Sequence, residues 1–179
     1  MFTSYTEEAR RAKFFGRFEA GNWGSTCIEP EHLLLGVLRE DRTLAQRFGL
    51  SVKASPDVDG GIVDVTPVRK EIEAITPCHA KSNVFVEMSL SQSSNRALTY
   101  AVAYADAFGH KHVGTEHLFL GILRENNDVT AKIMGLHDID WEATRKWVET
   151  LSVEEHQPHA THPDPAAPQA GITNSAQPG

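Results

Sequence analysis

The sequence has 179 residues, of which 40% are hydrophobic, and a formal net charge of −7. This length allows one ordinary domain or two very small ones. An acidic chain without clustered basic and aromatic residues is a poor partner for nucleic acid. No apolar run approaches the roughly 18 residues of a membrane span, and the N-terminus lacks the apolar core of a signal peptide. We therefore expect a cytoplasmic protein without membrane contact, in which Cys27 and Cys78 are free thiols.

The first predicted helix begins after Thr6, whose hydroxyl can cap a free backbone N–H ahead of two glutamates. Small and apolar residues then recur at spacings of four, four and three, at Ala12, Gly16, Ala20 and Trp23. Gly24 fits the position after a helix end. We expect three aromatic side chains of this helix, Phe14, Phe15 and Phe18, to lie in the core.

A second helix follows from Pro30, which suits a first helical turn. Shorter helices are predicted over about 42–48 and 67–76, separated by a loop with proline and glycine over Ser51–Val65. The alternation of apolar residues over Ser82–Leu90 predicts an extended connector or a short strand.

The second helix recurs further along the chain. Glu31–Glu40 and Glu116–Glu125 share eight of ten residues at an offset of 85, and the same offset places Thr6 on Ser91. The repeated unit covers roughly 6–50 and 91–135. Both copies keep an interior glycine, Gly36 and Gly121, although glycine costs about 1 kcal/mol in a helix. This repetition indicates the close approach of a neighbouring helix.

In the second copy Thr115 is the expected cap, and further helices are predicted over about 128–134 and 141–151. The fold expected is all-α. Two pseudo-twofold-related four-helix repeats, about 3–77 and 90–152, bury a common apolar seam in one domain, 1–152. The proline-rich tail, 153–179, is expected to be disordered.

The second copy carries the motif Gly-His-x-x-Val-Gly-Thr-Glu-His-Leu-x-Leu-Gly-Ile-Leu-Arg-Glu over Gly109–Glu125. With its partial copy at Glu31–Glu40, this motif resembles the Clp N-terminal repeat domain, which caps the ClpA and ClpC unfoldases. The resemblance covers about residues 3–151. It implies a double four-helix repeat that receives substrates and adaptors. The chain has no Gly-x-x-x-x-Gly-Lys-[Ser/Thr] phosphate loop, so the resemblance implies a free-standing domain without an ATPase.

Some ClpC-type domains bind phosphorylated arginine, and the resemblance carries that site over to Glu31, Glu116, Thr6 and Ser91. A carboxylate can hold a guanidinium in a bidentate pair, while a helix N-terminus holds the phosphate. The first copy departs from the motif, since Glu29 and Pro30 replace Gly-Thr, and residues 91–94 read Ser-Gln-Ser-Ser. We expect the glutamate-headed helix ends to lie open to a partner.

Each of these site residues can also have a purely structural role. The glutamates can simply be first-turn acids, and Thr6 and Ser91 can be plain helix caps. A zinc site formed by His110, His112 and His117 is an alternative that lacks any cysteine, so we expect no metal and no cofactor. No motif places a base beside a nucleophile, so we expect no enzyme.

The function expected is that of a non-catalytic adaptor or regulator of the Clp protease system. Its partners would be Clp protease or unfoldase subunits and substrate polypeptides, including arginine-phosphorylated ones. A second hypothesis, from a different class, is a stress-related or small-ligand-sensing helical module with no connection to Clp proteolysis.

Overall fold

The computed structural model describes residues 4–50, 64–76 and 88–151. Over these ranges the chain forms eight helices and two strands of two residues each. The helices are α1 (Glu7–Asn22), α2 (Pro30–Glu40), α3 (Arg42–Arg47), α4 (Thr66–Ile75), α5 (Gln92–Ala107), α6 (Thr115–Glu125), α7 (Asp128–Leu136) and α8 (Trp141–Thr150). The strands are β1 (Ser4–Tyr5) and β2 (His112–Val113). The all-α prediction is confirmed, with four helices in each repeat.

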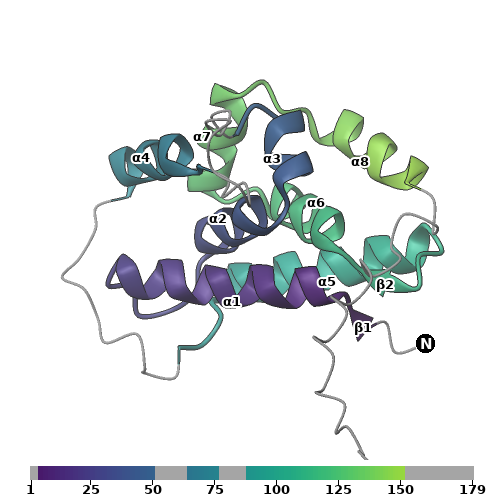
Figure 1. Cartoon of the computed structure of the whole chain (residues 1–179), viewed down its shortest axis with the longest axis horizontal. Helices are drawn as coiled ribbons and strands as arrows, with labels where there is room; N and C mark the ends of the chain where they lie inside the picture. The colour runs from purple at the N-terminus through teal and green to yellow at the C-terminus, as the bar shows by residue number, and fades with distance from the viewer. Residues whose placement is uncertain (1–3, 51–63, 77–87, 152–179) are drawn as a thin grey trace, which may run out of the picture.

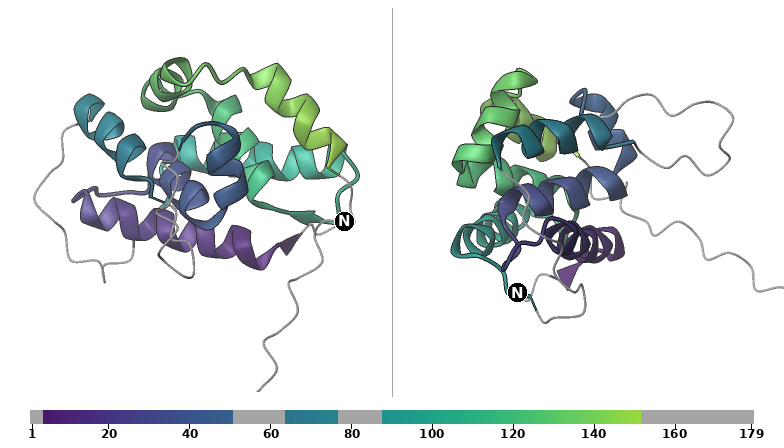
Figure 2. Two further views of the ribbon diagram at one scale, coloured as in Figure 1. Left: turned by 45° about the horizontal axis from the view of Figure 1, so that its top comes forward. Right: turned by 90° about the vertical axis from the view of Figure 1, so that its left-hand side faces the viewer.

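The helices lie in three tiers (Figures 1 and 2). The long helices α1 and α5 form one outer tier, α2 and α6 form the middle, and the short helices α3, α4, α7 and α8 cover the other side. Helix α2 packs on α1 and helix α6 on α5, and α2 and α6 pack against each other. The apolar side chains of both middle helices join one core, whose fully buried members include Leu34, Leu35, Phe119 and Ile122. The two repeats therefore bury a common apolar seam.

The close helix approach predicted from Gly36 and Gly121 is confirmed. A Cβ atom on Gly36 would lie against the carbonyl oxygen of Ala12 and 2.6 Å from the backbone nitrogen of Gly16. A Cβ on Gly121 would lie against the carbonyl of Ala97. In each repeat the backbone of the long helix occupies the space that a side chain on the middle helix would need.

Two local predictions were wrong. Helix α6 takes its N-cap at Gly114, not at Thr115, which is the first helical residue and donates its hydroxyl hydrogen to a neighbouring helix. Phe14 and Phe18 are 65% and 38% exposed instead of buried. Apart from Glu19, the buried face of α1 is made of small residues, because small side chains allow α2 to approach closely, and Phe14 and Phe18 project from the other faces.

Several expectations fall where the structure is not described. The loop over 51–63, most of the extended connector over 82–90, Cys78 and the tail from residue 152 lie outside the described residues. The expected domain bounds, 1–152 with a disordered tail over 153–179, therefore stay predictions. None of the helices in the described ranges is long and apolar enough to cross a membrane.

Candidate functional site

Short parallel pairings bring the two repeats together at their helix starts. Tyr5 pairs with Val113 in β1 and β2, and the backbone N–H of Thr6 donates to the carbonyl of Val113 at 3.0 Å. An equivalent bridge joins Ile28 to Leu90, where the N–H of Ser91 donates to the carbonyl of Ile28 at 3.0 Å. The start of α1 therefore lies beside the start of α6, and the start of α5 beside the start of α2.

The four predicted site residues therefore fall into two pairs, one at each junction between the repeats. Thr6, at the start of α1, is grouped with Glu116, at the start of α6 in the other repeat. Ser91, at the start of α5, is grouped with Glu31, at the start of α2. Each candidate site thus combines a hydroxyl from one repeat with a carboxylate from the other. The sequence alone did not indicate this exchange.

Both hydroxyls act as helix caps. The Thr6 side chain accepts the backbone N–H of Ala9, and the Ser91 side chain accepts that of Ser94, each at 3.1 Å. Their capping role is therefore confirmed. A role in ligand binding stays a prediction.

The expectation that both glutamates lie open to a partner was wrong. Glu31 and Glu116 are each only 4% exposed. The start of α7 covers Glu31, because the Asn127 side chain that caps α7 donates to its Oε2 at 3.0 Å. At the start of α6, Thr115 donates to the carboxylate of Asp41, which caps α3, at 2.7 Å. The starts of α2 and α6 are thus each closed by a helix cap of the opposite repeat, and burial raises the pKa of Glu31.

The two glutamates are not equivalent. The Glu116 side chain folds back over Gly114, where an added Cβ would lie 2.7 Å from its carboxyl carbon. It thereby reaches Nδ1 of His117 at 2.7 Å. The first repeat has Glu29 in place of Gly114, so the same fold-back is closed to Glu31, which turns to Asn127. Because Glu29 replaces the glycine of the motif, the site around Glu31 differs chemically from the site around Glu116.

Of the three histidines considered for a metal, two come together. Nδ1 of His110 lies 2.8 Å from Nε2 of His117, while His112 contacts Ser4 instead. With Glu116 these two histidines offer donor atoms within 4.8 Å of one another, a donor set that zinc uses. Nδ1 of His117 also accepts the N–H of Gly114 at 3.0 Å. The three side chains form a chain through the His117 ring, with His110 on its Nε2 side and Glu116 on its Nδ1 side.

The matching ring of the first repeat, His32, is buried and neutral. Its Nδ1 accepts the N–H of Glu29 at 3.0 Å, and the ring packs against Trp23. Burial lowers the pKa of His32 from 6.5 to about 4. A histidine whose pKa is lower in the folded state than in the unfolded state binds a proton more readily in the unfolded chain. The free energy of unfolding therefore falls as the pH drops from the unfolded pKa towards the folded pKa.

We expect His32 to make the free energy of unfolding fall between pH 6.5 and about 4.5. The unfolded ring takes up a proton near its ordinary pKa, whereas the folded ring stays neutral until about pH 4. The loss due to this residue is ~2 kcal/mol. Urea denaturation of the wild type and of His32→Gln at both pH values measures it. Parallel losses in the two proteins would show that His32 is not the group responsible.

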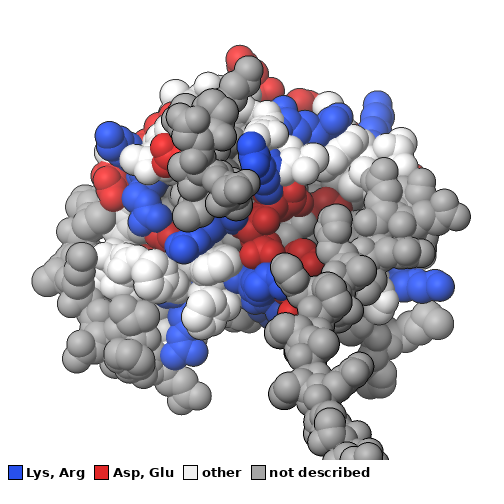
Figure 3. Space-filling model, in the orientation of Figure 1, with Lys and Arg blue, Asp and Glu red and all other residues white. Residues whose placement is uncertain are grey.

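Figure 3 shows how charged side chains are distributed on one face of the molecule. Acidic side chains gather near the middle of the face, and lysines and arginines lie around them. On the described part of this face, basic residues are interspersed with acidic ones and form no continuous basic patch.

Comparison with known proteins places this arrangement in a family. The sequence model of a family described as "Clp repeat (R) N-terminal domain" matches residues 61–167. The ClpA homolog of Guillardia theta, an ATP-binding subunit of the ATP-dependent Clp protease, is 28% identical over 162 residues. That alignment covers 90% of this chain but 19% of the relative, so the chain spans about a fifth of the relative's length.

Solved structures share the fold. The N-terminal domain of ClpD from Arabidopsis thaliana superposes with a TM-score of 0.63 at 22% identity, covering 82% of this chain and 95% of that domain. The Hsp104 N-terminal domain from Candida albicans gives 0.59 at 13% identity, covering 86% and 93%. Since the family model matches more than half of the sequence, this chain belongs to the Clp repeat N-terminal domain family.

Proposed function

We propose that this chain is a non-catalytic protein-binding module of the Clp protease system, acting in the cytoplasm as an adaptor or regulator. The observation that supports the proposal is that, in two places, a capped helix start of one repeat lies beside a glutamate-headed helix start of the other. The caps of α1 and α5 each satisfy one first-turn N–H group, and a helix N-terminus favours acidic or phosphorylated peptide groups. Its partners would be Clp subunits, adaptors and substrate polypeptides.

Capture from native cell extract tests this function. The full chain, immobilised through a tag, is expected to enrich Clp unfoldase or protease subunits, or substrates of that protease, over a tag-only control. The captured proteins are identified by mass spectrometry. If they contain neither Clp subunits nor substrates of that protease, the proposal is contradicted.

For phosphoarginine, we expect binding through the site of Thr6 and Glu116. The carboxylate of Glu116 would pair with the guanidinium and the start of α1 would hold the phosphate. The other site has Glu29 beside Glu31, and this additional negative charge repels a phosphate. Because Glu116 is buried, binding requires its side chain to leave His117.

Calorimetric titration with free phosphoarginine tests this site. Glu116→Ala is expected to weaken binding at least about tenfold, while Glu31→Ala, a matched change in the other repeat, stays within about twofold of the wild type. Circular dichroism checks that both variants fold. Equal affinity of the wild type and Glu116→Ala, or no binding to the wild type, would remove phosphoarginine from the proposal.

One observation favours the second hypothesis, a small-ligand-sensing module. A cleft of about 280 Å³ lies between the end of α3 and α8, where the rings of Phe48 and Trp147 meet, with Arg47 over the Trp147 ring and Asp138 in the lining. Ligand sites combine such an apolar floor with a few polar groups. Thermal-shift screening of small metabolites, read out by Trp147 fluorescence, separates this function from the one above, which needs no small ligand.

A further inference from the structure

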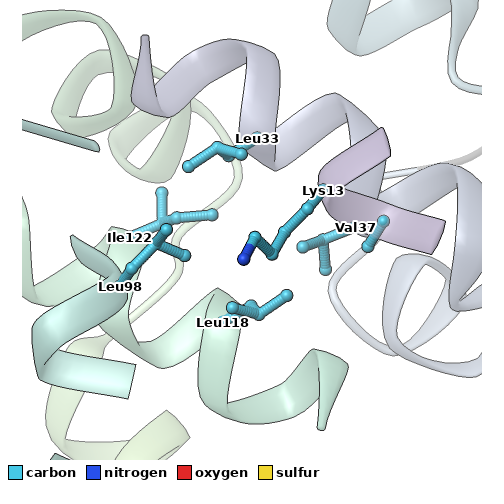
Figure 4. Close-up of a pocket in the computed structure, with 7 residues that line it drawn as sticks. Lys13, Leu33, Val37, Leu98, Leu118 and Ile122 are labelled. Atoms are coloured by element: carbon cyan, nitrogen blue, oxygen red, sulfur yellow. The ribbon is translucent and has the colours of Figure 1, made fainter. Parts of the chain in front are cut away.

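The seam between the two repeats is closed by packing (Figure 4). Four of the aliphatic side chains around it are at most 3% exposed, namely Leu33, Val37, Leu118 and Ile122. Lys13, which points towards them, lies over the Tyr5 ring, 4.2 Å from its centre. The seam is therefore packed core. Open space for a ligand lies instead in the cleft between the end of α3 and α8.

This cleft has an aromatic floor that is anchored in the core. The rings of Phe48 and Trp147 meet edge to face with their centres 5.7 Å apart, and Phe48 also packs on the fully buried ring of Phe119 at 4.9 Å. The cleft volume of about 280 Å³ lies just below the range of about 300–1,000 Å³ that holds drug-sized ligands. The cleft therefore suits a small molecule with an apolar part.

Three of the five polar side chains that line the cleft are satisfied by the protein itself. Asp140 caps α8 by accepting the backbone N–H of Ala143 at 2.7 Å, and the Thr144 hydroxyl donates to the carbonyl of Asp140 at 2.7 Å. Nε2 of His137 lies 2.8 Å from Oε2 of Glu71. These three side chains hold the wall of the cleft together.

The other two, Arg47 and Asp138, are exposed and carry opposite charges. The Arg47 guanidinium stacks on the Trp147 ring, 4.4 Å from its centre, and makes no ion pair with a described carboxylate. A stacked guanidinium keeps its in-plane N–H groups available for a carboxylate. Asp138 makes no hydrogen bond or ion pair with a described residue, and its carboxylate is more than 4.0 Å from the Arg47 guanidinium. The cleft thus presents a separate cation and anion beside an aromatic floor.

We propose that this cleft binds a free α-amino acid with an aromatic side chain. Such a molecule is a zwitterion, so its carboxylate pairs with Arg47 and its ammonium group pairs with Asp138. Its side chain packs on the rings of Phe48 and Trp147, where aromatic contact adds to the burial of apolar area. A residue inside a polypeptide has neither charge on its backbone, which favours the free amino acid. This inference rests on the second proposed function, small-ligand sensing, and gives it a ligand class.

Titration of the full ¹⁵N-labelled chain with L-phenylalanine tests the inference, followed by NMR at the indole N–H of Trp147, whose signal Trp147→Phe assigns. Two analogues each lack one charge, since phenylalaninamide has no carboxylate and hydrocinnamate has no ammonium group. The titrations are made at about pH 6, below the pKa of an α-amino group. We expect the wild type to bind phenylalanine about threefold or more tightly than either analogue, with smaller ratios at high salt. Equal affinity for all three, or no binding of phenylalanine, would overturn the inference.

Two substitutions separate the contributions of the two charges. In Arg47→Gln the affinity ratio of phenylalanine to phenylalaninamide is expected to fall to about one, while the ratio to hydrocinnamate is kept. Asp138→Asn should have the converse effect, and asparagine tolerates the left-handed backbone of this residue, with φ 51°. Arg42→Gln, on the same helix as Arg47 but outside the cleft, keeps both wild-type ratios. Wild-type ratios in Arg47→Gln or in Asp138→Asn would also overturn the inference.

These outcomes are distinguishable from failure of the proposed functions. If phenylalanine does not bind but another small metabolite raises Tm, the ligand class is wrong and small-ligand sensing stands. If no small metabolite binds, both the ligand class and small-ligand sensing are contradicted. Capture of Clp proteins is a separate readout, because the lining of the cleft includes neither Glu31 nor Glu116.

Discussion

Gly121→Ala is expected to destabilise the protein by at least about 3 kcal/mol, a large share of the total stability of a small domain. The added methyl would meet the carbonyl oxygen of Ala97 and lie 2.9 Å from the backbone nitrogen of Ala101. Both atoms belong to the backbone of α5, which cannot rotate away as a side chain can. The two helices would have to separate along their whole contact, with loss of packing in the core.

Urea denaturation followed by circular dichroism measures this effect, and the chain offers a matched control. Gly135 lies in α7, and a Cβ added there would meet no atom within 4 Å. Gly135→Ala is therefore expected to be neutral or to stabilise the protein by up to about 1 kcal/mol through helix propensity. Gly36→Ala should match Gly121→Ala, since it contacts α1 in the same way. If the free energy of unfolding of Gly121→Ala lies within about 1 kcal/mol of the wild-type value, the close packing of α5 on α6 is not needed for stability.

The local parts of this fold could be predicted because they depend on residues close in sequence. The cap at Thr6 and the helix starts near Pro30 and Asp140 follow from side chains within one turn of the backbone groups that they satisfy. The tight helix contacts at Gly36 and Gly121 were indicated by the repetition of an unfavourable residue. In each case the physical cause lies inside one repeat.

The site could not be predicted in the same way, because its geometry depends on how the repeats dock. The pairing of Ser4 with His112 joins segments more than 100 residues apart. Glu31 is buried by Asn127 of the opposite repeat, and no local pattern signals that contact. An available signal was Glu29, which replaces the glycine of the motif and adds a negative charge to the first copy alone.

Disrupting the ion pair that joins α1 to α4 is expected to have the second large effect on stability. Glu19 is fully buried and receives two contacts from Arg69, at 2.7 Å from Nη2 to Oε1 and 2.6 Å from Nη1 to Oε2. Arg39 lies further off, at 3.9 Å. In the second repeat the counterpart of Glu19 is Tyr104, whose ring stacks on Phe108. The buried charge is therefore specific to the first repeat.

Glu19→Gln is expected to destabilise the protein by about 3 kcal/mol, because it replaces the fully buried carboxylate by a neutral amide that faces the partly buried Arg69 guanidinium. Joint replacement by Glu19→Met and Arg69→Met should recover most of that loss, since the buried charge goes with its partner. Glu149→Gln, in an exposed pair with Arg145, should change the free energy of unfolding by less than about 0.5 kcal/mol. Urea titrations of the four proteins, with hydrogen exchange to follow α4, measure these effects. A double variant as unstable as Glu19→Gln would mean that shape, and not charge, holds α4 in place.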